Sequence, residues 1–455
     1  MLKVQSSKSE DTICALATAP GGALGVIRVS GPQSLEILSH VFTKNLAQAQ
    51  PNTIHYGHIK DGPEIIDEVL VSIFRAPYSY TGEDSAEISC HGSRYILNKV
   101  LELLIQNGCR MANPGEYTQR AFLNGKMDLS QAEAVADLIA SGNKATHQLA
   151  MSQLRGGVSN KLAQLREQLL HLTSLLELEL DFSDHEDLEF ADRFELKEIA
   201  NNIDKHITRL AHSFETGQAI KQGIPVAIIG KTNVGKSTLL NRLLHEDRAI
   251  VSDVHGTTRD TIEDSIDLQG VTFRFIDTAG IRQTTDEVEK IGIERTYAAM
   301  EKARIILWMV DEEPSQKELN KISLYAENKK LIILRNKIDK KENKAFTLVK
   351  IPLIAISAKH GTNIDALESA IYEAADIPTL TDTDIIVTNA RHYDALTRAH
   401  DHIQRVINGL QHQLSGDLLS EDLRQAIDTL SEITGSQITP NEVLGNIFKN
   451  FCVGK

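Results

Sequence analysis

The residues from Gly230 to Ser237 have the types and the spacing of a loop that binds nucleotide phosphates. In such a loop, glycines let backbone N–H groups converge on phosphate oxygens, a lysine ammonium reaches the β- and γ-phosphates, and a hydroxyl holds Mg²⁺. Lys236 and Ser237 occupy the two side-chain positions. We therefore expect this loop to bind a nucleotide through Asn233, Val234, Gly235, Lys236, Ser237 and Thr238.

The residues on either side of the loop are those that a nucleotide-binding domain needs. An apolar run at 224–229 predicts a buried strand, and 238–244 predicts the start of a helix whose N-terminal dipole faces the phosphates. A second motif, Asp277-Thr278-Ala279-Gly280, follows the apolar run 271–276. Its carboxylate can orient a water on Mg²⁺, and its glycine N–H can approach the γ-phosphate. Alone this motif is common in turns, but after a phosphate-binding loop it predicts a G domain.

The choice of base depends on a third motif, Asn336-Lys337-Ile338-Asp339, which follows the apolar run 331–334. The carboxylate of Asp339 can accept two parallel hydrogen bonds from guanine, whereas adenine has no such donor pair and would leave it unpaired. Alone, the motif also fits an ordinary loop between a strand and a helix. Three ordered motifs, each after an apolar run, predict GTP. Ser357-Ala358-Lys359, after the run 353–356, is expected to complete the base pocket with a backbone donor to guanine O6.

Between the first two motifs lies the sequence Gly256-Thr257-Thr258-Arg259-Asp260, in which Thr258 is the natural switch threonine. Its hydroxyl would complete the Mg²⁺ shell, and its carbonyl would face the attacking water. A threonine-rich turn without this role is the alternative interpretation. We expect nucleotide contacts from Ser252, Asp253, Val254, His255, Gly256, Thr257 and Thr258.

The residue directly after the second motif raises a problem for catalysis. Many small GTPases place a water-orienting glutamine there, whereas this chain has Ile281. Because its side chain neither donates nor accepts a hydrogen bond, hydrolysis must be assisted from elsewhere or be very slow. The amide of Asn233 could hold a monovalent cation beside the phosphates in place of an arginine finger. A role for Asn233 in capping the loop is an equally good alternative.

The arrangement of the chain around these motifs predicts several domains. Its 455 residues correspond to about three domains. The stretch from Asp382 onward is short and helical, so we expect it to pair with the helical stretch that precedes the G domain. In that earlier stretch, 130–139 predicts an Ala-rich helix. One apolar stripe predicts a helical bundle, with an intermolecular coiled coil as the minor alternative: Leu162, Leu165, Leu169, Leu172 and Leu176.

The expected fold is an α+β N-terminal domain, followed by an α-helical domain that carries an inserted α/β P-loop G domain with a mostly parallel sheet. The N-terminal domain is expected because strand-like runs alternate with turns at 12–17, 24–29 and 69–74. The expected boundaries are 1–118 for the N-terminal domain, 119–216 and 378–455 for the helical domain, and 217–377 for the G domain. An acidic tract is expected to be a solvated linker rather than a metal site: Asp181, Asp184, Glu186, Asp187 and Glu189.

The assembled motifs resemble, through essentially the whole chain, the bacterial and organellar tRNA-modification GTPase family MnmE, also called TrmE. Several of them are specific to that family and are not shared by GTPases generally. The stretches that carry the resemblance are Asp11-Thr12-Ile13, Ile27-Arg28-Val29-Ser30-Gly31, Tyr80-Thr81-Gly82-Glu83-Asp84, Asn113-Pro114-Gly115-Glu116-Tyr117, Ala121-Phe122-Leu123-Asn124-Gly125-Lys126, Ala132-Glu133-Ala134, Gly256-Thr257-Thr258-Arg259-Asp260, Gly292-Ile293-Glu294-Arg295 and Cys452-Val453-Gly454-Lys455.

This resemblance implies a homodimer whose N-terminal domain dimerises and binds 5-formyl- or 5,10-methylene-tetrahydrofolate. It further implies an FAD-dependent partner, MnmG (GidA), which carries the FAD. Together the two proteins would add an aminomethyl or carboxymethylaminomethyl group to C5 of the wobble uridine of certain tRNAs. Hydrolysis of GTP to GDP and phosphate would drive conformational steps. K⁺-dependent pairing of the G domains would supply the assistance that Ile281 cannot.

The resemblance also assigns roles to single residues. Glu289 would be the general base, acting through a bridging water, and would complete the catalytic set with Lys236 and Thr258. Ser237 and Thr258 would hold Mg²⁺, and K⁺ would be held by Asn233, Ser252, Val254 and Thr257. The folate site would consist of Arg28, Glu87, Lys126 and Lys455.

The chemistry of folate suits these four residues, since a carboxylate can accept two hydrogen bonds from the pterin and cations complement the glutamate tail. Cys452 would lie beside the folate with a reactive or structural thiol, and a packed cysteine near a terminus is an equally good interpretation. The last four residues formally match a prenylation box. Gly454 is not aliphatic and Lys455 is not a usual final residue, so prenylation is rejected.

Composition limits the cell compartment and the partners. The 4 cysteines, Cys14, Cys90, Cys109 and Cys452, show no paired short spacing, which suits free thiols in a reducing cytoplasm. The N-terminus is too polar for a secretory signal, and the longest apolar run, 305–310, is too short to span a membrane. We therefore expect a cytoplasmic protein without a membrane segment.

The charge of the chain argues against tight binding of tRNA by this protein alone. The net charge is −14, with 62 acidic against 48 basic residues, whereas an RNA-binding surface normally has a basic footprint. We expect the partner to supply much of the tRNA affinity.

Two other functions remain open. One is a ribosome-assembly or signalling switch GTPase, against which the long N-terminal domain, the split helical segments and the terminal Cys-Val-Gly-Lys argue. The other is a folate-dependent one-carbon transferase without GTPase activity, against which the intact nucleotide motifs argue.

Overall fold

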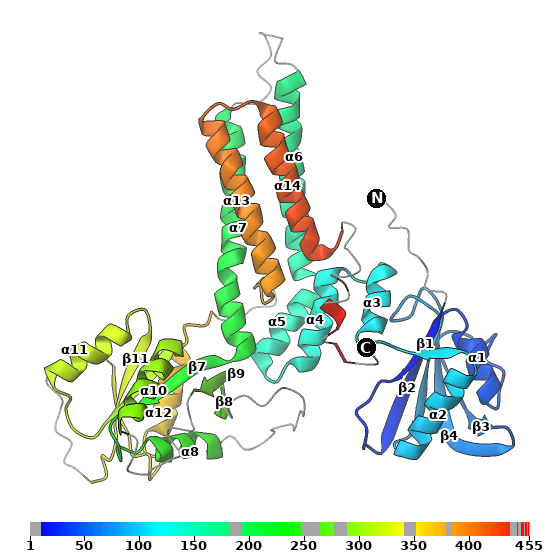
Figure 1. Cartoon of the computed structure of the whole chain (residues 1–455), viewed down its shortest axis with the longest axis horizontal. Coiled ribbons are helices and arrows are strands. Elements are labelled where there is room, and N and C mark those ends of the chain that lie inside the picture. The colour runs from blue at the N-terminus through cyan, green and yellow to red at the C-terminus, as the bar shows by residue number, and fades with distance from the viewer. Residues whose placement is uncertain are drawn as a thin grey trace. The chain divides into compact units, whose positions relative to one another are not determined.

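The computed structural model describes residues 11–181, 193–246, 264–276, 289–340, 352–378 and 384–436, together with 444, 447–449, 451, 452 and 454. These residues form two compact units, whose course along the chain can be followed by colour in Figure 1. The first unit draws on Met1–Ala140, Ala150–Arg209 and Arg391–Lys455, and the second on Ser141–Leu149 and Leu210–Ala390. The second unit is therefore inserted into the first along the chain. The four-part boundaries at 118, 216 and 377 remain predictions.

The N-terminal part of the first unit is a mixed sheet with the strand order β3-β4-β5-β2-β1-β6. Strands β1 and β6 are parallel, and the other neighbouring strands are antiparallel. The strands are β1 (Thr12–Leu16), β2 (Leu24–Ser30), β3 (Thr53–Asp61), β4 (Glu64–Phe74), β5 (Ser85–His91) and β6 (Cys109–Met111). The three helices of this part are α1 (Ser34–Val41), α2 (Arg94–Gln106) and α3 (Glu116–Leu123).

The two faces of this sheet are covered differently, because successive side chains along a strand point to opposite faces. One face packs against α1 and α2 in a core that contains Ile27, Leu38 and Val100. On the other face, Ile13 of β1 packs against Tyr117 of α3, and both side chains are fully buried. The helix α3 is thus placed over the face of β2 that carries Arg28.

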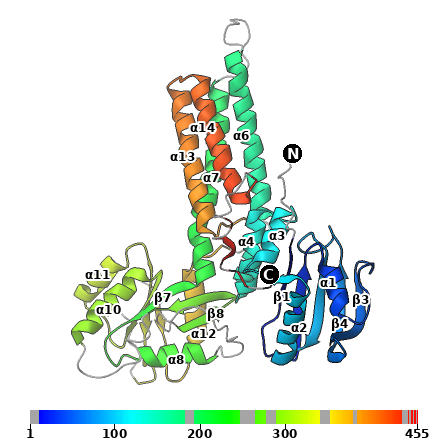
Figure 2. The same cartoon turned by 45° about the vertical axis from the view of Figure 1, so that its right-hand side comes forward.

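The helical part of the first unit forms the predicted bundle. All five leucines of the apolar stripe, from Leu162 to Leu176, are buried. Figure 2 shows α6, α7, α13 and α14 running lengthwise beside one another. Glu177 of α6 pairs with Arg424 of α14, and Asp204 of α7 pairs with His400 of α13. The helices that lie wholly or in part in this unit are α4 (Leu129–Ala140), α5 (Lys144–Leu154), α6 (Gly157–Asp181), α7 (Arg193–Gln222), α13 (Ala390–Gln411) and α14 (Gly416–Thr434).

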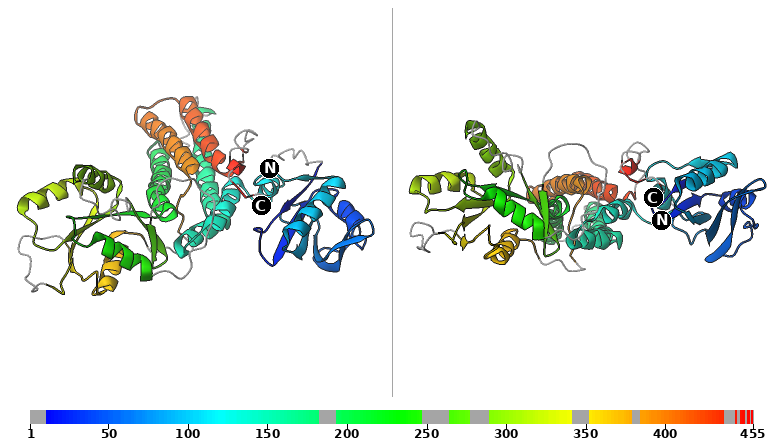
Figure 3. Two further views of the ribbon diagram at one scale, coloured as in Figure 1. Left: turned by 60° about the horizontal axis from the view of Figure 1, so that its bottom comes forward. Right: turned by 90° about the horizontal axis from the view of Figure 1, so that it is seen from below.

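The second unit is the predicted α/β G domain, in which helices lie on both sides of the sheet in the views of Figure 3. The strand order of this sheet is β12-β11-β10-β7-β9-β8. All neighbouring strands are parallel except β8 and β9. Its strands are β7 (Ile224–Ile229), β8 (Asp264–Leu268), β9 (Val271–Phe275), β10 (Ile305–Val310), β11 (Lys330–Arg335) and β12 (Leu353–Ala355). Its helices are α8 (Lys236–Glu246), α10 (Glu289–Lys302), α11 (Gln316–Tyr325) and α12 (Ile364–Ala374).

Helices cover both faces of this sheet, so its central strands are apolar throughout. Every residue of β10 is buried, as expected for a central parallel strand. On one face Leu239 of α8 and Leu367 of α12 join the core, and on the other Met300 of α10 and Leu319 of α11 do so. The apolar runs predicted as strands before the nucleotide motifs are confirmed as β7, β9, β11 and β12.

One short segment between α4 and α6 packs against the G domain, and its sequence did not indicate this packing. Residues 141–149, which the sequence analysis assigned to the helical domain, belong to the second unit. The backbone N–H of Ala145 donates to the carbonyl oxygen of Gly270 at 3.0 Å, and Asn143 Nδ2 donates to Thr272 Oγ1 at 2.7 Å. Ala145 and Leu149 are buried in the G-domain core.

Candidate functional site

The loop predicted to bind phosphates has a backbone that few residue types can adopt. It follows β7, and the φ angles of Gly230, Asn233 and Gly235 are 149°, 59° and 111°. Positive φ strains most side chains, while glycine adopts it freely and asparagine tolerates it. A Cβ atom at Gly235 would also overlap the side-chain amide of Asn336. Both glycines of the motif are therefore required by the fold of the loop.

Lys236 begins α8 directly after this loop. Its ammonium donates to the carbonyl oxygens of Gly230 at 2.7 Å and Lys231 at 2.9 Å. Burial lowers the pKa of Lys236, because the charged ammonium loses hydration there. The N-terminus of α8 adds positive potential at the same place. The negative charge of a phosphate group would compensate both the buried ammonium and the positive potential at the helix N-terminus. The loop therefore fits a phosphorylated ligand. Ser237 and Thr238 lie in the first turn of α8.

Asn336 connects the phosphate side of the site to the base side. Its side-chain nitrogen donates to the carbonyl oxygen of Val234 at 2.8 Å. Its side-chain oxygen accepts from the backbone N–H of Ala358 at 3.0 Å. Asn336 is only 5% exposed, so both bonds are shielded from water. The first motif, the third motif and the Ser357-Ala358-Lys359 segment therefore share one hydrogen-bonded centre.

Asp339, the residue predicted to recognise guanine, is oriented by its neighbours. Its Oδ1 atom accepts a hydrogen bond from Ser357 Oγ at 2.7 Å. This bond is the main cause that lowers the pKa of Asp339, which keeps the carboxylate ionised as an acceptor. Lys337 has a φ of 64°, and its ammonium pairs with Asp311 at 3.2 Å. The carbonyl oxygen of Lys359 accepts from Arg242 of α8 at 2.9 Å.

Several predicted nucleotide and metal residues lie outside the described residues. Glu289 begins α10, and only its backbone is described. The others outside the description are Ser252, Asp253, Val254, His255, Gly256, Thr257, Thr258, Asp277, Thr278, Ala279, Gly280 and Lys455. Of the acidic tract, Asp181 is the last residue of α6, and the remaining acids are also outside the description.

A second polar site lies on the N-terminal sheet, where Arg28 of β2 is directly opposite Glu87 of β5. Arg28 Nε and Nη2 both donate to Glu87 Oε1, at 3.0 and 2.7 Å. Among the described residues, none donates to Glu87 Oε2, and this side chain is 33% exposed. The geometry therefore leaves one carboxylate oxygen of Glu87 available to a ligand that donates hydrogen bonds.

Two aromatic side chains flank Arg28, and the sequence analysis did not name them as site residues. The centre of the guanidinium lies 5.4 Å from the ring centroid of Tyr80 and 5.6 Å from that of Tyr117. The Tyr117 hydroxyl also donates to the carbonyl oxygen of Arg28 at 2.8 Å. Both tyrosines belong to stretches that carry the family resemblance, which is the signal that could have identified them. The site therefore combines a carboxylate, a guanidinium and aromatic faces.

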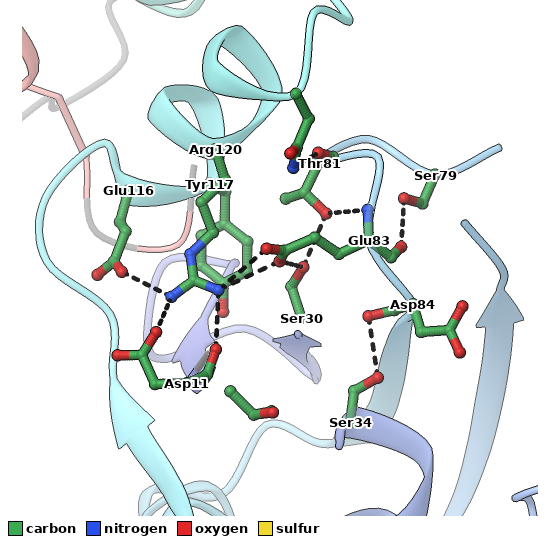
Figure 4. Close-up of polar contacts among 12 residues, drawn as sticks. Asp11, Ser30, Ser34, Ser79, Thr81, Glu83, Asp84, Glu116, Tyr117 and Arg120 are labelled. Atoms are coloured by element: carbon green, nitrogen blue, oxygen red, sulfur yellow. Dashed lines mark hydrogen bonds and ion pairs between the residues drawn. The ribbon is translucent and has the colours of Figure 1, made fainter. Parts of the chain in front are cut away.

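A buried polar network, shown in Figure 4, surrounds Glu83. This residue lies on the same loop as Tyr80. Arg120 of α3 is 4% exposed, and its Nη atoms reach Glu83 at 3.2 Å and Glu116 at 2.9 Å. Ser30 of β2 donates to the same Glu83 carboxylate at 2.8 Å. Because these charged groups are withdrawn from water, removing one partner would leave another uncompensated. The network thus fixes this loop against β2 and α3.

The remaining predicted folate-site residues lie around the same part of the sheet. Lys126 donates from its ammonium to the carbonyl oxygen of Pro77 at 2.8 Å, on the segment that leads to Tyr80. Arg28 Nη1 donates to the carbonyl oxygen of Gly454 at 3.2 Å, so the C-terminal segment reaches this site. The carbonyl oxygen of Cys452 accepts from the backbone N–H of Gly115 at 3.3 Å, and the cysteine itself is exposed.

Neither a membrane span nor a protein-built metal cluster is found in the part of the chain that the structure describes. No helix there is both long and apolar enough to cross a bilayer. Likewise, no three His, Cys, Asp or Glu side chains there are grouped so as to hold a metal ion.

Comparisons with known proteins match both parts of the first unit. A family model described as the MnmE helical domain matches residues 129–452, and one described as the N-terminus of the GTP-binding protein TrmE matches residues 12–126. Among solved structures, the G domain of the FeoB iron transporter of T. maritima covers 33% of this chain and 98% of its own, with 23% identity and a TM-score of 0.25.

Relatives match over nearly the full length. The tRNA modification GTPase MnmE of Phocaeicola vulgatus is 57% identical over 496 residues, which cover 98% of this chain and 99% of that protein. The tRNA modification GTPase MnmE of Bacteroides thetaiotaomicron is also 57% identical, over 466 residues that cover 98% of this chain and 100% of that protein. The chain therefore belongs to the MnmE family of tRNA modification GTPases.

Proposed function

We propose that the chain hydrolyses GTP to GDP and phosphate, and that this hydrolysis serves the modification of the wobble uridine of certain tRNAs. The observation that carries the nucleotide part is the double hydrogen bond of Asn336, which joins the phosphate loop to the base loop. The tRNA part is supported by relatives named tRNA modification GTPase that are 57% identical over nearly the full length.

In this proposal, different residues around Asn336 bind different parts of the nucleotide. Lys236 exchanges its two carbonyl partners for the β- and γ-phosphates, which restores the charge compensation that burial removed. The backbone at the start of α8 donates to phosphate oxygens. Asp339, held by Ser357, accepts from guanine N1–H and N2–H₂, and the segment 357–359 donates to O6.

Mg²⁺ and K⁺ complete the phosphate side in this proposal. The hydroxyls of Ser237 and Thr258 hold Mg²⁺, and the hard oxygen atoms of Asn233, Ser252, Val254 and Thr257 hold K⁺. When bound, these cations neutralise charge that develops on the transferred phosphoryl group. Glu289 orients the attacking water through a bridging water, a role that Ile281 cannot take. K⁺ binding accompanies the pairing of two G domains in a homodimer.

The polar site on the N-terminal sheet is proposed to bind 5-formyl- or 5,10-methylene-tetrahydrofolate. Glu87 is held by Arg28 through one carboxylate oxygen, so its other oxygen can accept hydrogen bonds from a pterin. The partly exposed ring of Tyr80 offers an apolar face to a flat heterocycle, and the buried ring of Tyr117 packs against Arg28. Lys126 and Lys455 complement the carboxylates of the glutamate tail. The folate supplies the one-carbon unit when bound.

The full reaction in this proposal requires a second protein. The FAD-dependent MnmG (GidA) carries the FAD and binds much of the tRNA, in keeping with the net charge of −14 on this chain. The product is an aminomethyl or carboxymethylaminomethyl group on C5 of the wobble uridine. The site of action is the cytoplasm.

A reconstituted reaction tests this proposal. The full chain is mixed with the FAD-dependent partner, unmodified tRNA, GTP, glycine or ammonium, and methylene-tetrahydrofolate labelled in the one-carbon unit. We expect label in the tRNA uridine with wild type, loss of label but retained GTP turnover with Glu87→Gln, and loss of both with Lys236→Ala. Glu68→Gln, on the neighbouring strand β4, is the matched control and keeps both. GTP turnover without any label in wild type would instead favour an assembly or signalling switch.

A further inference from the structure

The hydroxyl of Tyr80 is anchored on α3 by a contact that the site described above does not use. Tyr80 Oη lies 2.8 Å from Thr118 Oγ1, a distance at which either hydroxyl can donate a hydrogen bond. Among the described residues, each of these two hydroxyls has the other as its only hydrogen-bond partner. Thr118 is fully buried, whereas Tyr80 is 36% exposed. The far end of the Tyr80 side chain is therefore fixed inside the protein, while part of the side chain stays open to solvent.

This anchor makes α3 the support of both aromatic rings beside Arg28. Thr118 directly follows Tyr117 on α3. The Tyr117 ring is fully buried, and its hydroxyl donates to the carbonyl oxygen of Arg28 at 2.8 Å. The helix thus fixes the ring of Tyr117 by burial. It fixes the partly exposed ring of Tyr80 through the hydroxyl of Thr118.

The backbone of the loop that carries Tyr80 is held by separate contacts. Asn124 Nδ2, just after α3, donates to the carbonyl oxygen of Thr81 at 2.8 Å. The polar network of Figure 4 holds Glu83 of the same loop. None of these bonds reaches the side chain of Tyr80. Its rotamer therefore depends on the bond to Thr118 and on the contact with the guanidinium of Arg28.

We propose that Thr118 is a positioning residue of the site on the N-terminal sheet, whose hydroxyl holds the ring of Tyr80 in the orientation that stacks on the bound pterin. This inference rests on the proposed function, in which that site binds a tetrahydrofolate. A ring that is already held at its far end loses less conformational entropy when a flat ligand arrives, so the ligand binds more tightly. Because Thr118 is fully buried, it acts through Tyr80 and not by touching the ligand.

Two substitutions at Thr118 distinguish this role from simple packing. Thr118→Val keeps the shape of the side chain and removes the hydroxyl, whereas Thr118→Ser keeps the hydroxyl and removes a methyl group. If the hydrogen bond matters, Thr118→Val is the weaker binder of the two. If only packing matters, Thr118→Ser is the weaker one. Tyr80→Phe removes the other half of the same bond, and it does so without a change in the buried helix.

Equilibrium binding of radiolabelled 5-formyl-tetrahydrofolate to the full chain tests this inference. We expect Thr118→Val and Tyr80→Phe each to weaken binding about three- to tenfold, which corresponds to the loss of one hydrogen bond. Thr118→Ser should stay within about twofold of wild type, because its hydroxyl remains. The double variant Tyr80→Phe, Thr118→Val should bind no more weakly than the weaker single variant, because both substitutions remove the same bond.

The labelled one-carbon transfer with the FAD-dependent partner gives a second measurement. Thr118→Val should raise the KM for the folate and leave kcat unchanged, since a saturating ligand itself holds the ring. The matched control is Thr173→Val in α6, another buried helical threonine, whose hydroxyl donates to the carbonyl oxygen of Leu169 at 2.9 Å. This control should bind folate as wild type does. Urea unfolding of each variant confirms that the chain is folded under the binding conditions.

Several results would overturn the inference and leave the folate proposal standing. These are wild-type affinity in Thr118→Val or in Tyr80→Phe, additive losses in the double variant, weaker binding by Thr118→Ser than by Thr118→Val, and an equal loss in Thr173→Val. Absence of folate binding by the wild-type chain would overturn the folate part of the proposed function, and the inference with it.

Discussion

The side-chain nitrogen of Asn336 donates to the carbonyl oxygen of Val234 at 2.8 Å, so the loop proposed to select guanine is tied to the loop proposed to hold the phosphates. The same side chain accepts from Ala358, which anchors the third loop of the site. One buried amide therefore sets the distance between the two ends of the nucleotide. The site is pre-formed around Asn336 rather than assembled from independent loops.

Asn336→Ala is expected to weaken both folding and nucleotide binding. The substitution leaves the carbonyl of Val234 and the N–H of Ala358 without their partner, which costs about 2–4 kcal/mol of unfolding free energy. The affinity for GTP should fall at least about tenfold, because the loops are no longer held in register. Urea denaturation and fluorescent-GDP titration measure the two effects. Asn320→Ala, at an exposed position of α11, should change stability by less than about 0.5 kcal/mol. An equally small effect at Asn336 would contradict the bridging role.

Asp339→Asn is expected to change the preferred base. An amide cannot accept both hydrogen bonds from guanine, but it can pair with the additional oxygen of xanthine. We expect GTP affinity to fall by at least about 100-fold and xanthosine triphosphate to bind better than GTP. Competition against labelled nucleotide measures this preference. Asp365→Asn, at an exposed position of α12, should keep the wild-type preference. Retained GTP preference in Asp339→Asn would rule out base recognition by this carboxylate.

The four cysteines are expected to differ widely in how fast they react with a thiol reagent. Cys14, Cys90 and Cys109 are buried, and Cys452 is exposed. Burial raises the pKa of the Cys90 thiol to about 12, so it carries almost no thiolate at pH 8. A chromogenic thiol reagent at pH 8 should therefore titrate one thiol in the folded protein and four in urea. The folded Cys452→Ser variant should show none. Rapid reaction of more than one thiol in the native chain would contradict the buried positions.

Acid should destabilise the first unit through Glu133 of α4. This buried carboxylate lies 2.7 Å from His392 Nε2 and accepts from Arg391 Nε and Nη2 at 3.0 Å. Burial acts to raise the pKa of Glu133, but His392 and Arg391 outweigh it, so the net pKa lies below its ordinary value of 4.5. A carboxyl group with a lowered folded pKa stabilises the fold above its unfolded pKa, and this contribution is lost as pH falls through the folded value.

The variant Glu133→Gln should therefore lose about 3–5 kcal/mol at pH 7, because Arg391 is left without its buried partner. Below pH 4.5 the difference from wild type should shrink, since wild type loses the same interaction there. Urea unfolding at a series of pH values measures both effects. Glu432→Gln, in an exposed pair with Arg398, should cost less than about 1 kcal/mol at every pH. A difference that stays constant with pH would show that Glu133 is not ionised in the fold.

Parts of this architecture could be predicted because they leave a local pattern. A central parallel strand is buried on both faces and needs an unbroken apolar run, which is why 224–229 and 331–334 were recognisable. The leucine stripe of α6 follows from helical periodicity in the same way. The family resemblance supplied Arg28 and Glu87 without their geometry.

Other features depend on contacts between distant segments and have no local signal. Arg28 and Glu87 meet only because the register of β2 and β5 places them opposite each other. Asn336 and Val234 meet because β7 and β11 lie on either side of β10 in the G-domain sheet, which brings the loops that follow them together. The packing of 141–149 on β8 and β9 depends on bonds to Gly270 and Thr272, which no periodicity indicates.

The central claim, GTP hydrolysis assisted by a cation at Asn233, is tested most directly by GTP turnover of the purified chain in K⁺ and in Na⁺ at equal ionic strength. Asn233 has a φ of 59°, so the informative variant is Asn233→Gly, which removes the amide but keeps a residue suited to that backbone. We predict strong stimulation by K⁺ in wild type and its loss in Asn233→Gly. Equally slow turnover in both salts, or K⁺ stimulation that persists in Asn233→Gly, would contradict the account.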